Sequence, residues 1–171
     1  MVAFTESKII LTGKEPDINA GSEELSNVLI ERLGLMPRKK GSTEKMHNVL
    51  IELYERAKEA SKRKMPNKAI MTVEEMGFFA GITRQTMYDY LKRWIELELI
   101  NKVSYIDPDN NVVIGYRLNG NTLEQAFEKT RVKVNNNLDL TGKYIKELQR
   151  VLKNEKIRNS QNSEEEGEKE Q

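Results

Sequence analysis

The chain contains no cysteine and only one histidine among its 171 residues. This excludes disulfide scaffolds, cysteine nucleophiles and Cys/His zinc sites, and it leaves His47 as the one histidine for a catalytic triad. We expect His47 at the edge of a helical core. Carboxylate chemistry also lacks a motif, because no Gly-rich phosphate loop or paired-carboxylate pattern is present. The sequence therefore predicts a binding protein that is not an enzyme, with no cofactor and no metal.

Long hydrophobic runs are missing as well. No segment approaches the roughly 18 consecutive apolar residues of a membrane span, and the first residues lack the charged-then-apolar pattern of a secretory signal. We therefore expect a soluble cytoplasmic protein with no membrane partner. With 171 residues and a hydrophobic content of 37%, the chain is suited to one compact domain with appendages.

Net charge is small, at +1, but it is unevenly distributed along the chain. Residues 159–171 carry five glutamates and one lysine, which gives −4 and leaves +5 on the rest of the chain. This acidic tail contains no apolar residue, and we expect it to be disordered. The remainder has the composition of a mildly basic binding domain.

Residues 1–41 are expected to form an N-terminal arm, one short helix and a basic loop. Apolar residues at three-and-four spacing predict the helix over residues 22–33, which Gly34 and Pro37 end. The loop supplies three consecutive cations that we expect to contact phosphates. These are Arg38, Lys39 and Lys40.

Residues 42–120 contain the elements of a second region. A helix capped by Ser42 or Thr43 is predicted to run until Pro66 stops it, with one continuous apolar stripe. Residues 68–71 that follow are short enough for one small strand.

The segment after Thr72 has the pattern of two helices joined by a tight turn. Thr72 and Glu75 form a capping box at the start of the first helix. Gly77 supplies a small residue where the two helices cross, and Gly81 can adopt the left-handed conformation of the turn. The string from Gly77 to Leu91 resembles the helix-turn-helix of many bacterial and archaeal regulators.

The second helix of this pair has one apolar and one polar face. Leu91 follows Met87 by four positions, and Trp94 and Ile95 follow Leu91 by three and four, which is typical of an inward face. The opposite side chains suit base edges in a major groove, because arginine pairs with guanine, glutamine with adenine and aspartate with cytosine. The base-facing candidates are Thr83, Arg84, Gln85, Tyr88 and Asp89.

The alternative for this helix is an ordinary solvated face, and the local charge argues against it. Residues 62–93 carry seven basic and three acidic residues. Flanking cations and one hydroxyl are expected to meet phosphates. This phosphate-contacting group consists of Lys68, Thr72, Lys92, Arg93, Lys102 and Arg117.

Residues 102–106 and 112–118 are two β-rich runs around a five-residue loop, which predicts a hairpin. The order of helix, helix-turn-helix and hairpin resembles the winged helix family over about residues 43–120. The resemblance implies a mainly α fold with a small β-hairpin, in which the second helix of the pair enters the major groove and the hairpin, or wing, lies along the backbone or minor groove. The wing tip departs from the family pattern, because it carries Asp107 and Asp109 and no cation.

The run from Gly34 to Gly41, ahead of this domain and with a long C-terminal helix behind it, is similar to the euryarchaeal activators of the archaellum (motility) operon. This likeness implies an activator that binds upstream of the basal promoter elements and helps to recruit the general initiation factors. Composition and spacing do not distinguish activation from repression.

Residues 121–158 are predicted to form a C-terminal helical dimerisation region. A capping box at Thr122 opens the helix, while three asparagines and Gly142 predict a break near residues 136–142. The apolar stripe beyond the break needs a partner, for which a second copy of the chain is the simplest. Its residues are Tyr144, Ile145, Leu148, Val151 and Leu152. The alternative is that this helix folds back on residues 22–33.

Together these features favour a homodimeric transcription regulator that binds specific double-stranded DNA sequences. A twofold dimer would read two half-sites about one helical turn apart. A competing interpretation is a winged helix that binds protein in a replication or chromosome-segregation assembly, which the acidic wing tip favours. The two interpretations differ in whether Arg84, Gln85 and Tyr88 govern DNA binding.

Overall fold

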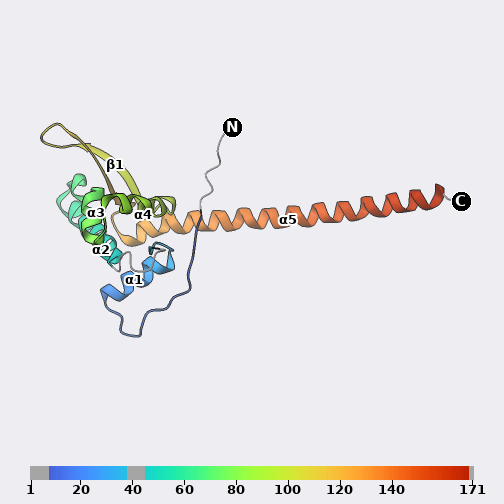
Figure 1. Ribbon diagram of the computed structural model, residues 1–171, viewed down its shortest axis with the longest axis horizontal. Coiled ribbons are helices and arrows are strands. Elements are labelled where there is room, and N and C mark those ends of the chain that lie inside the picture. Colours follow the sequence, from blue (N-terminus) through green and yellow to red (C-terminus); the bar gives the residue numbers. More distant parts are fainter. Residues whose placement is uncertain (1–7, 38–44, 170–171) are drawn as a thin grey trace. The chain divides into compact units, whose positions relative to one another are not determined.

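The computed structural model describes residues 8–37 and 45–169 (Figure 1). Within these residues the chain is mainly helical with one small antiparallel hairpin, as the sequence predicts. The elements in chain order are α1 (Ser22–Arg32), α2 (Met46–Arg63), the short 3-10 helix η1 (Pro66–Ala69), α3 (Val73–Ala80), α4 (Arg84–Glu96), β1 (Ile100–Ile106), β2 (Val112–Leu118) and α5 (Leu123–Lys169). The chain divides into two compact units, Met1–Arg131 and Val132–Gln171.

One face of α2 forms the centre of the core of the first unit. Its apolar residues recur at three-and-four spacing and are buried, which confirms the predicted stripe except at half-buried Tyr54. The buried apolar residues are Met46, Val49, Leu50, Leu53, Ala57 and Ala60, and His47 is buried beside them. Trp94 of α4 and Ile30 of α1 join the same core with no exposed surface.

Both ends of α2 differ in detail from the sequence-based expectation. The expected caps Ser42 and Thr43 lie outside the described residues, and the helix begins after Lys45. At the other end Lys64 adopts the left-handed conformation with φ of 53°, so the helix ends at Arg63, three residues before Pro66.

The link from α2 to α3 is not the small strand that we expected over residues 68–71. Pro66 stands at the start of η1, and its fixed φ favours a helical turn there. Only Met71 pairs with the hairpin: its amide donates to the carbonyl of Tyr116 over 2.8 Å, and the amide of Tyr116 donates back over 2.7 Å. This bridge places the start of α3 against the edge of β2.

The hairpin that projects from the helices has the predicted antiparallel arrangement (Figure 1). Its register runs from Ile100 opposite Leu118 to Ile106 opposite Val112. The loop between the strands is closed by Asp107, whose amide donates to the carbonyl of Asn111 over 2.9 Å.

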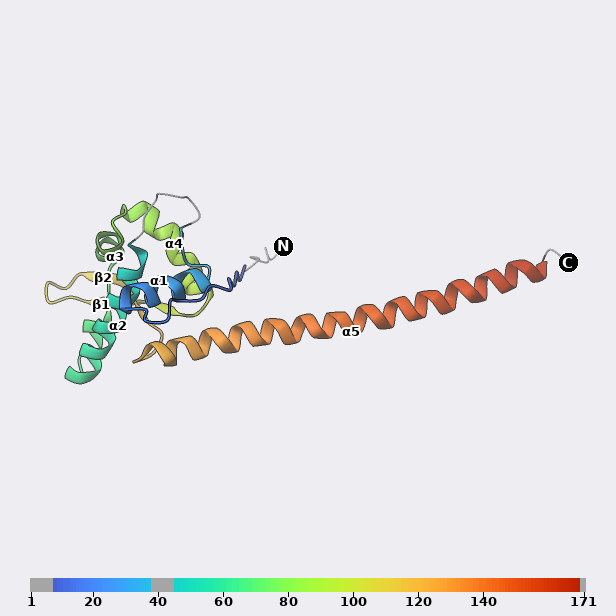
Figure 2. The ribbon, with the colours of Figure 1, turned by 90° about the horizontal axis from the view of Figure 1, so that it is seen from below.

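The long helix α5 is uninterrupted (Figure 2). The break expected near residues 136–142 is absent, because the propensity cost of asparagine and glycine, about 1 kcal/mol or less each, does not outweigh the continuous helical hydrogen bonding. Residues 159–169, expected to be disordered, continue the same helix, and the hydroxyls of Ser160 and Ser163 donate to carbonyls four residues earlier. None of the helices described is both long enough and apolar enough to cross a bilayer.

Candidate nucleic-acid interface

The angle between α3 and α4 depends on two glycines. A Cβ placed on Gly77 would lie 2.8 Å from the carbonyl oxygen of Ile82, closer than real Cβ atoms approach an oxygen. Gly81 ends α3 with φ of 67°, the left-handed conformation that the sequence predicts. Glycine at these positions therefore lets α4 leave the end of α3 at a tight corner.

The start of α3 is fixed by the predicted capping box. The Thr72 amide donates to the Glu75 carboxylate over 2.8 Å, and the Glu75 amide donates to the Thr72 hydroxyl over 3.3 Å. These bonds satisfy two amides that the helix itself leaves without partners.

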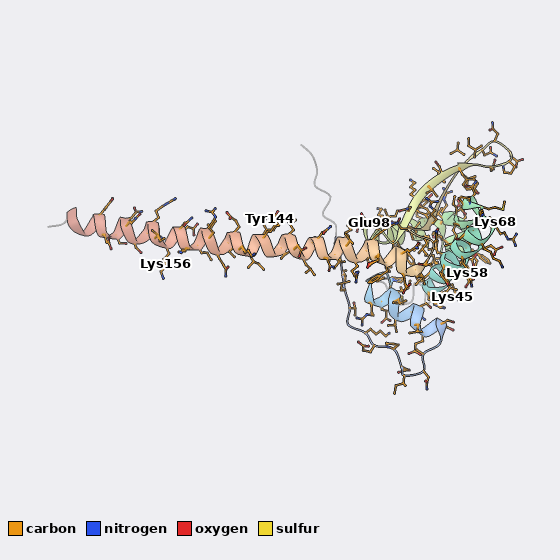
Figure 3. All side chains as sticks on the ribbon, turned by 180° about the vertical axis from the view of Figure 1, so that it is seen from behind. Lys45, Lys58, Lys68, Glu98, Tyr144 and Lys156 are labelled. Carbon is orange, nitrogen blue, oxygen red and sulfur yellow. The ribbon has the colours of Figure 1, made fainter. Side chains whose placement is uncertain are left out.

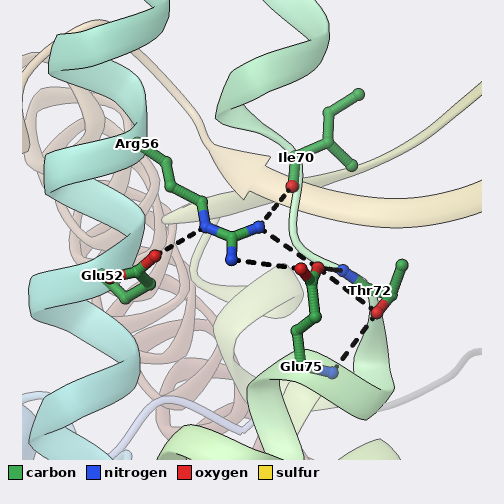
Figure 4. A network of polar contacts seen from close by, with 5 residues as sticks. All are labelled: Glu52, Arg56, Ile70, Thr72 and Glu75. Carbon is green, nitrogen blue, oxygen red and sulfur yellow. Dashed lines mark hydrogen bonds and ion pairs between the residues drawn. The ribbon is translucent and has the colours of Figure 1, made fainter.

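Arg56 of α2 connects this cap to the core helix (Figure 4). Its guanidinium donates to the Glu75 carboxylate over 3.1 and 3.2 Å, to Glu52 over 2.7 Å and to the carbonyl of Ile70 over 2.9 Å. Partial burial raises the pKa of Glu75, but the hydrogen bonds from Arg56 and the Thr72 amide outweigh it and hold that pKa below its usual value. The network therefore fixes the position of α3 relative to α2.

Helix α4 turns its apolar face into the core. Thr83 caps it by accepting a hydrogen bond from the amide of Thr86 over 3.3 Å. Met87, Leu91 and Trp94 are buried as predicted, whereas Ile95 is 37% exposed because the buried stripe continues through Leu97.

The opposite face of α4 is polar and exposed, and it carries four of the five base-facing candidates. Arg84, Gln85, Tyr88 and Asp89 lie together on this face, with Lys92 one turn further on. Thr83 is the N-cap residue before the helix and is exposed at its N-terminal end. The solvent-exposed set from Arg84 to Lys92 is called the α4 polar face below.

Arg84 is already oriented on the α4 polar face. Its guanidinium donates to the Tyr88 hydroxyl over 3.3 Å, lies 5.6 Å from the centre of the Tyr88 ring, and forms an ion pair with Glu74 of α3 at 3.2 Å. The Tyr88 bond and the Glu74 charge raise the pKa of Arg84, so it stays cationic. Stacking on Tyr88 restricts the rotamers of the arginine that is expected to read a base.

Strand β1 of the hairpin packs against α4. Burial is the main cause that raises the pKa of Tyr116 on β2, and the charge of Tyr88 on α4 adds to it. Lys102 is the cross-strand partner of Tyr116, so its side chain is on the same face of the hairpin. Lys102 is exposed there.

Two other predicted phosphate contacts are on the opposite face of the hairpin. Arg117 alternates with Tyr116 along β2 and lines a polar groove with Lys64 and Lys129. Lys68 lies in another groove with Lys58 (Figure 3). The sequence-based set is therefore split between the two faces, because strand alternation separates residues that are adjacent in sequence.

Thr72 and Arg93 have structural roles that the sequence-based assignment overlooked. The Thr72 hydroxyl belongs to the capping box, and Arg93 is partly buried with its guanidinium donating to the carbonyl of Gly34 over 3.0 Å. Both side chains hold elements of the fold together. Three further predicted cations, Arg38, Lys39 and Lys40, lie outside the described residues.

Lys45 is a neighbour of the helix pair that sequence reasoning missed. Its side chain passes 3.6 Å from the position of a Cβ on Gly81, so it lies at the turn between α3 and α4. No motif marks it, because the fold alone brings the start of α2 to this turn.

No group of three or more metal-ligating side chains is assembled among the residues that the structure describes. Comparison with known proteins gives no match to a family model, a curated protein or a solved structure.

Proposed function

We propose that the protein is a homodimeric, winged helix-turn-helix regulator of transcription that binds specific sequences in double-stranded DNA. The observation that carries this proposal is the α4 polar face. It presents arginine, glutamine, tyrosine and aspartate in adjacent turns of an exposed helix at the end of a glycine-dependent corner. Such a helix has the dimensions and the hydrogen-bonding groups that a major groove accepts.

In this proposal α4 enters the major groove and Arg84 donates two hydrogen bonds to a guanine. Gln85 pairs with adenine, and Asp89 accepts from the amino group of cytosine. Glu74 holds the Arg84 guanidinium before binding, and this ion pair opens when the base takes its place. Both partners are more than half exposed, so opening it costs little.

Phosphate contacts come from cations on the elements around the helix pair. Lys92 ends the α4 polar face, Lys102 is exposed on β1, which contacts α4, and Lys45 is at the turn between α3 and α4. These contacts position the helix without reading sequence. They replace Arg117 and Lys68, which are on the other face of the hairpin.

The wing takes a reduced part in DNA binding. The Asp107 carboxylate at its tip accepts from the amide and side chain of Asn111, and these bonds hold its pKa below the usual value. A charged carboxylate at the tip disfavours insertion into the minor groove, which has a negative potential.

The narrower part of the proposal is an activator of archaellum operon type in the cytoplasm. This part depends on the resemblance of the run from Gly34 to Gly41 and of the elements behind it. In this role the protein would contact the general initiation factors as well as DNA.

A second candidate function is a protein-interaction module, and one observation favours it. Ile106, Val112 and Ile114 on the hairpin are 64%, 70% and 52% exposed. Ile106 faces Val112 across the strands, and Ile114 is on the same side of the sheet. This apolar surface beside an acidic tip suits a protein partner better than a phosphate backbone.

Substitutions on the α4 polar face separate the two functions. Arg84→Ala is expected to cost about 1–3 kcal/mol at the preferred site and to relax specificity there, while Lys92→Ala weakens binding to all sequences alike. Lys58→Ala, in the groove on the far side of the hairpin, is the matched control and should leave binding unchanged. Equal losses on preferred and random duplexes for Arg84→Ala would contradict base reading and favour the protein-interaction module.

A further inference from the structure

The second unit contains the part of α5 that follows Arg131, and it leaves a regular, mostly apolar seam exposed. Seam positions follow each other at alternating spacings of four and three, which is the heptad pattern of a coiled coil. The seam residues are Val134, Leu138, Thr141, Ile145, Leu148 and Leu152. Leu138, Ile145 and Leu148 are 63%, 56% and 57% exposed, so the seam lacks a partner within the part of the chain that the structure describes.

The same spacing continues into one charged residue at each end of the seam. Arg131 precedes Val134 by three positions, and Glu155 follows Leu152 by three. Arg131 has an ion pair with Glu128 on the same helix, at the solvent-exposed surface. The seam is therefore uncharged and mostly apolar in its middle, cationic at its first position and anionic at its last.

The charges at the two ends distinguish the two ways in which a second copy can pack. A parallel pair places each seam residue opposite itself, so Arg131 meets the partner's Arg131 and Glu155 meets the partner's Glu155. Both contacts bring like charges together. An antiparallel pair centred on residue 143 places Arg131 opposite the partner's Glu155 at both ends, and opposite charges meet.

The middle of the seam also fits the antiparallel arrangement. Leu138 packs on the partner's Leu148, Val134 on the partner's Leu152, and Thr141 on the partner's Ile145. Each of these layers is free of charge.

The positions flanking the seam agree with the same centre. In an antiparallel pair Glu128, which flanks the seam, faces the partner's Lys156, and these residues form a second pair of opposite charges. Near the centre Gly142 meets the partner's Gly142, and a Cβ there would have no neighbour within 4 Å in the single chain. On the other side of the seam Tyr144 meets the partner's Tyr144. Tyr144 and Val151, which the sequence placed in the dimer contact, thus flank the seam.

We propose that α5 forms an antiparallel two-stranded coiled coil with a second copy of this chain, centred on residue 143 and closed at each end by Arg131 and the partner's Glu155. This inference deepens the homodimer of the proposed function and rests on it for its biological setting. It names the occupant of the seam and the orientation of the two helices.

Charge reversal of the full-length chain tests the orientation. Arg131→Glu and Glu155→Arg should each raise the dimer dissociation constant about tenfold at low salt, since each replaces two attractive contacts by two repulsive ones. The double variant should return close to the wild-type value. Lys143→Glu, an exposed charge reversal on the outer face of α5, is the control and should leave the constant unchanged.

A parallel coiled coil gives a different result in the same experiment. Each single reversal would exchange one like-charge contact for another, so the dissociation constant would stay the same and the double variant would show no rescue. That outcome would overturn the proposal, as would a chain that sedimentation shows to be monomeric at every concentration tested.

Spin-label distances provide a second test that does not depend on charge. The chain has no native cysteine, so single labels can be placed on the outer face of α5 at Lys143→Cys, Arg150→Cys and Ile157→Cys. In the antiparallel pair the two labels are offset along the axis by about 0, 21 and 42 Å, at a helical rise of about 1.5 Å per residue. Equal distances at all three positions would overturn the antiparallel arrangement.

Failure of this inference can be told from failure of the proposed function. DNA selection with the same samples reports on base reading by α4: a monomer that still prefers a sequence through Arg84 contradicts the coiled coil and the homodimer, and it supports base reading by α4. An antiparallel dimer that binds no duplex supports the coiled coil and contradicts the regulator.

Discussion

At the scale of single residues, the absence of a side chain at Gly77 shapes the site as much as any charge. The corner between α3 and α4 requires the close approach of Gly77 to the Ile82 carbonyl, and it aims the α4 polar face outward. Arg84 would still be exposed if this corner opened, but its position relative to the hairpin would change. The first determinant of the site is therefore steric.

Gly77→Ala should destabilise the fold by about 1–3 kcal/mol, because the new methyl group meets a backbone oxygen that cannot easily move. Urea denaturation of the full chain measures this. Gly13→Ala is the control, since nothing lies within 4 Å of its Cβ position. Equal urea midpoints for Gly77→Ala and wild type would contradict this prediction, because they would show that the corner accommodates the added methyl group.

The Arg56–Glu75 pair should make stability depend on pH. The folded state holds the pKa of Glu75 below the 4.5 of an unperturbed glutamate, so its contribution is present above about that pH and is lost as pH falls through the lower folded value. Glu75→Gln should cost about 1 kcal/mol near pH 7 and flatten the acid limb of the stability curve. Parallel acid limbs for the variant and wild type would rule out this contribution.

At the scale of elements, local signals in the sequence predict much of the fold. The capping box at Thr72 and the left-handed Gly81 each depend on a few neighbouring residues, and both are confirmed by the structure. The hairpin follows from two β-rich runs around a short polar loop. Such features can be predicted from the sequence because each is caused by neighbouring residues.

Features with causes far away in the sequence were not predictable. The roles of Arg93 and Lys45 come from contacts with Gly34 and Gly81, which the tertiary fold brings near. The expected break in α5 was wrong because weak residue propensities were given more weight than the continuity of a long helix. The separation of Lys102 from Arg117 depends on strand register, which composition does not reveal.

Removal of residues 143–171 should convert the protein to a monomer, because it deletes half of the α5 seam from Ile145 to Leu152. Light scattering of the shortened and the full chain at equal concentration measures this. Residues 1–131 form a compact unit of their own, so the shortened chain should keep its helical circular dichroism signal per residue in that unit. A dimer that survives the deletion would place the interface elsewhere.

At the scale of the whole molecule, the proposed regulator combines two copies of a DNA-binding unit that binds DNA only weakly by itself. A single α4 offers a few base contacts and few cations, which suffices only for weak binding. Two copies double both the reading face and the phosphate contacts. In this proposal, dimerisation through α5 is therefore part of the DNA-binding mechanism as well as of assembly.

The salt dependence of DNA affinity should show how much of the binding comes from contacts with phosphates. A dimer with roughly six to ten phosphate contacts should lose on the order of a thousandfold or more in affinity between about 50 and 200 mM salt. Fluorescence anisotropy with one labelled duplex at several salt concentrations measures the slope. A slope near zero would mean that phosphates are not contacted.

The most direct test of the regulator is the selection of bound duplexes from a random DNA pool by the full-length chain, followed by titration of the enriched and random duplexes with wild type and Arg84→Ala. The account predicts a recurring motif with two half-sites, preferential binding to it, and loss of that preference in the variant. No enrichment, or equal binding of every duplex by both proteins, would contradict it.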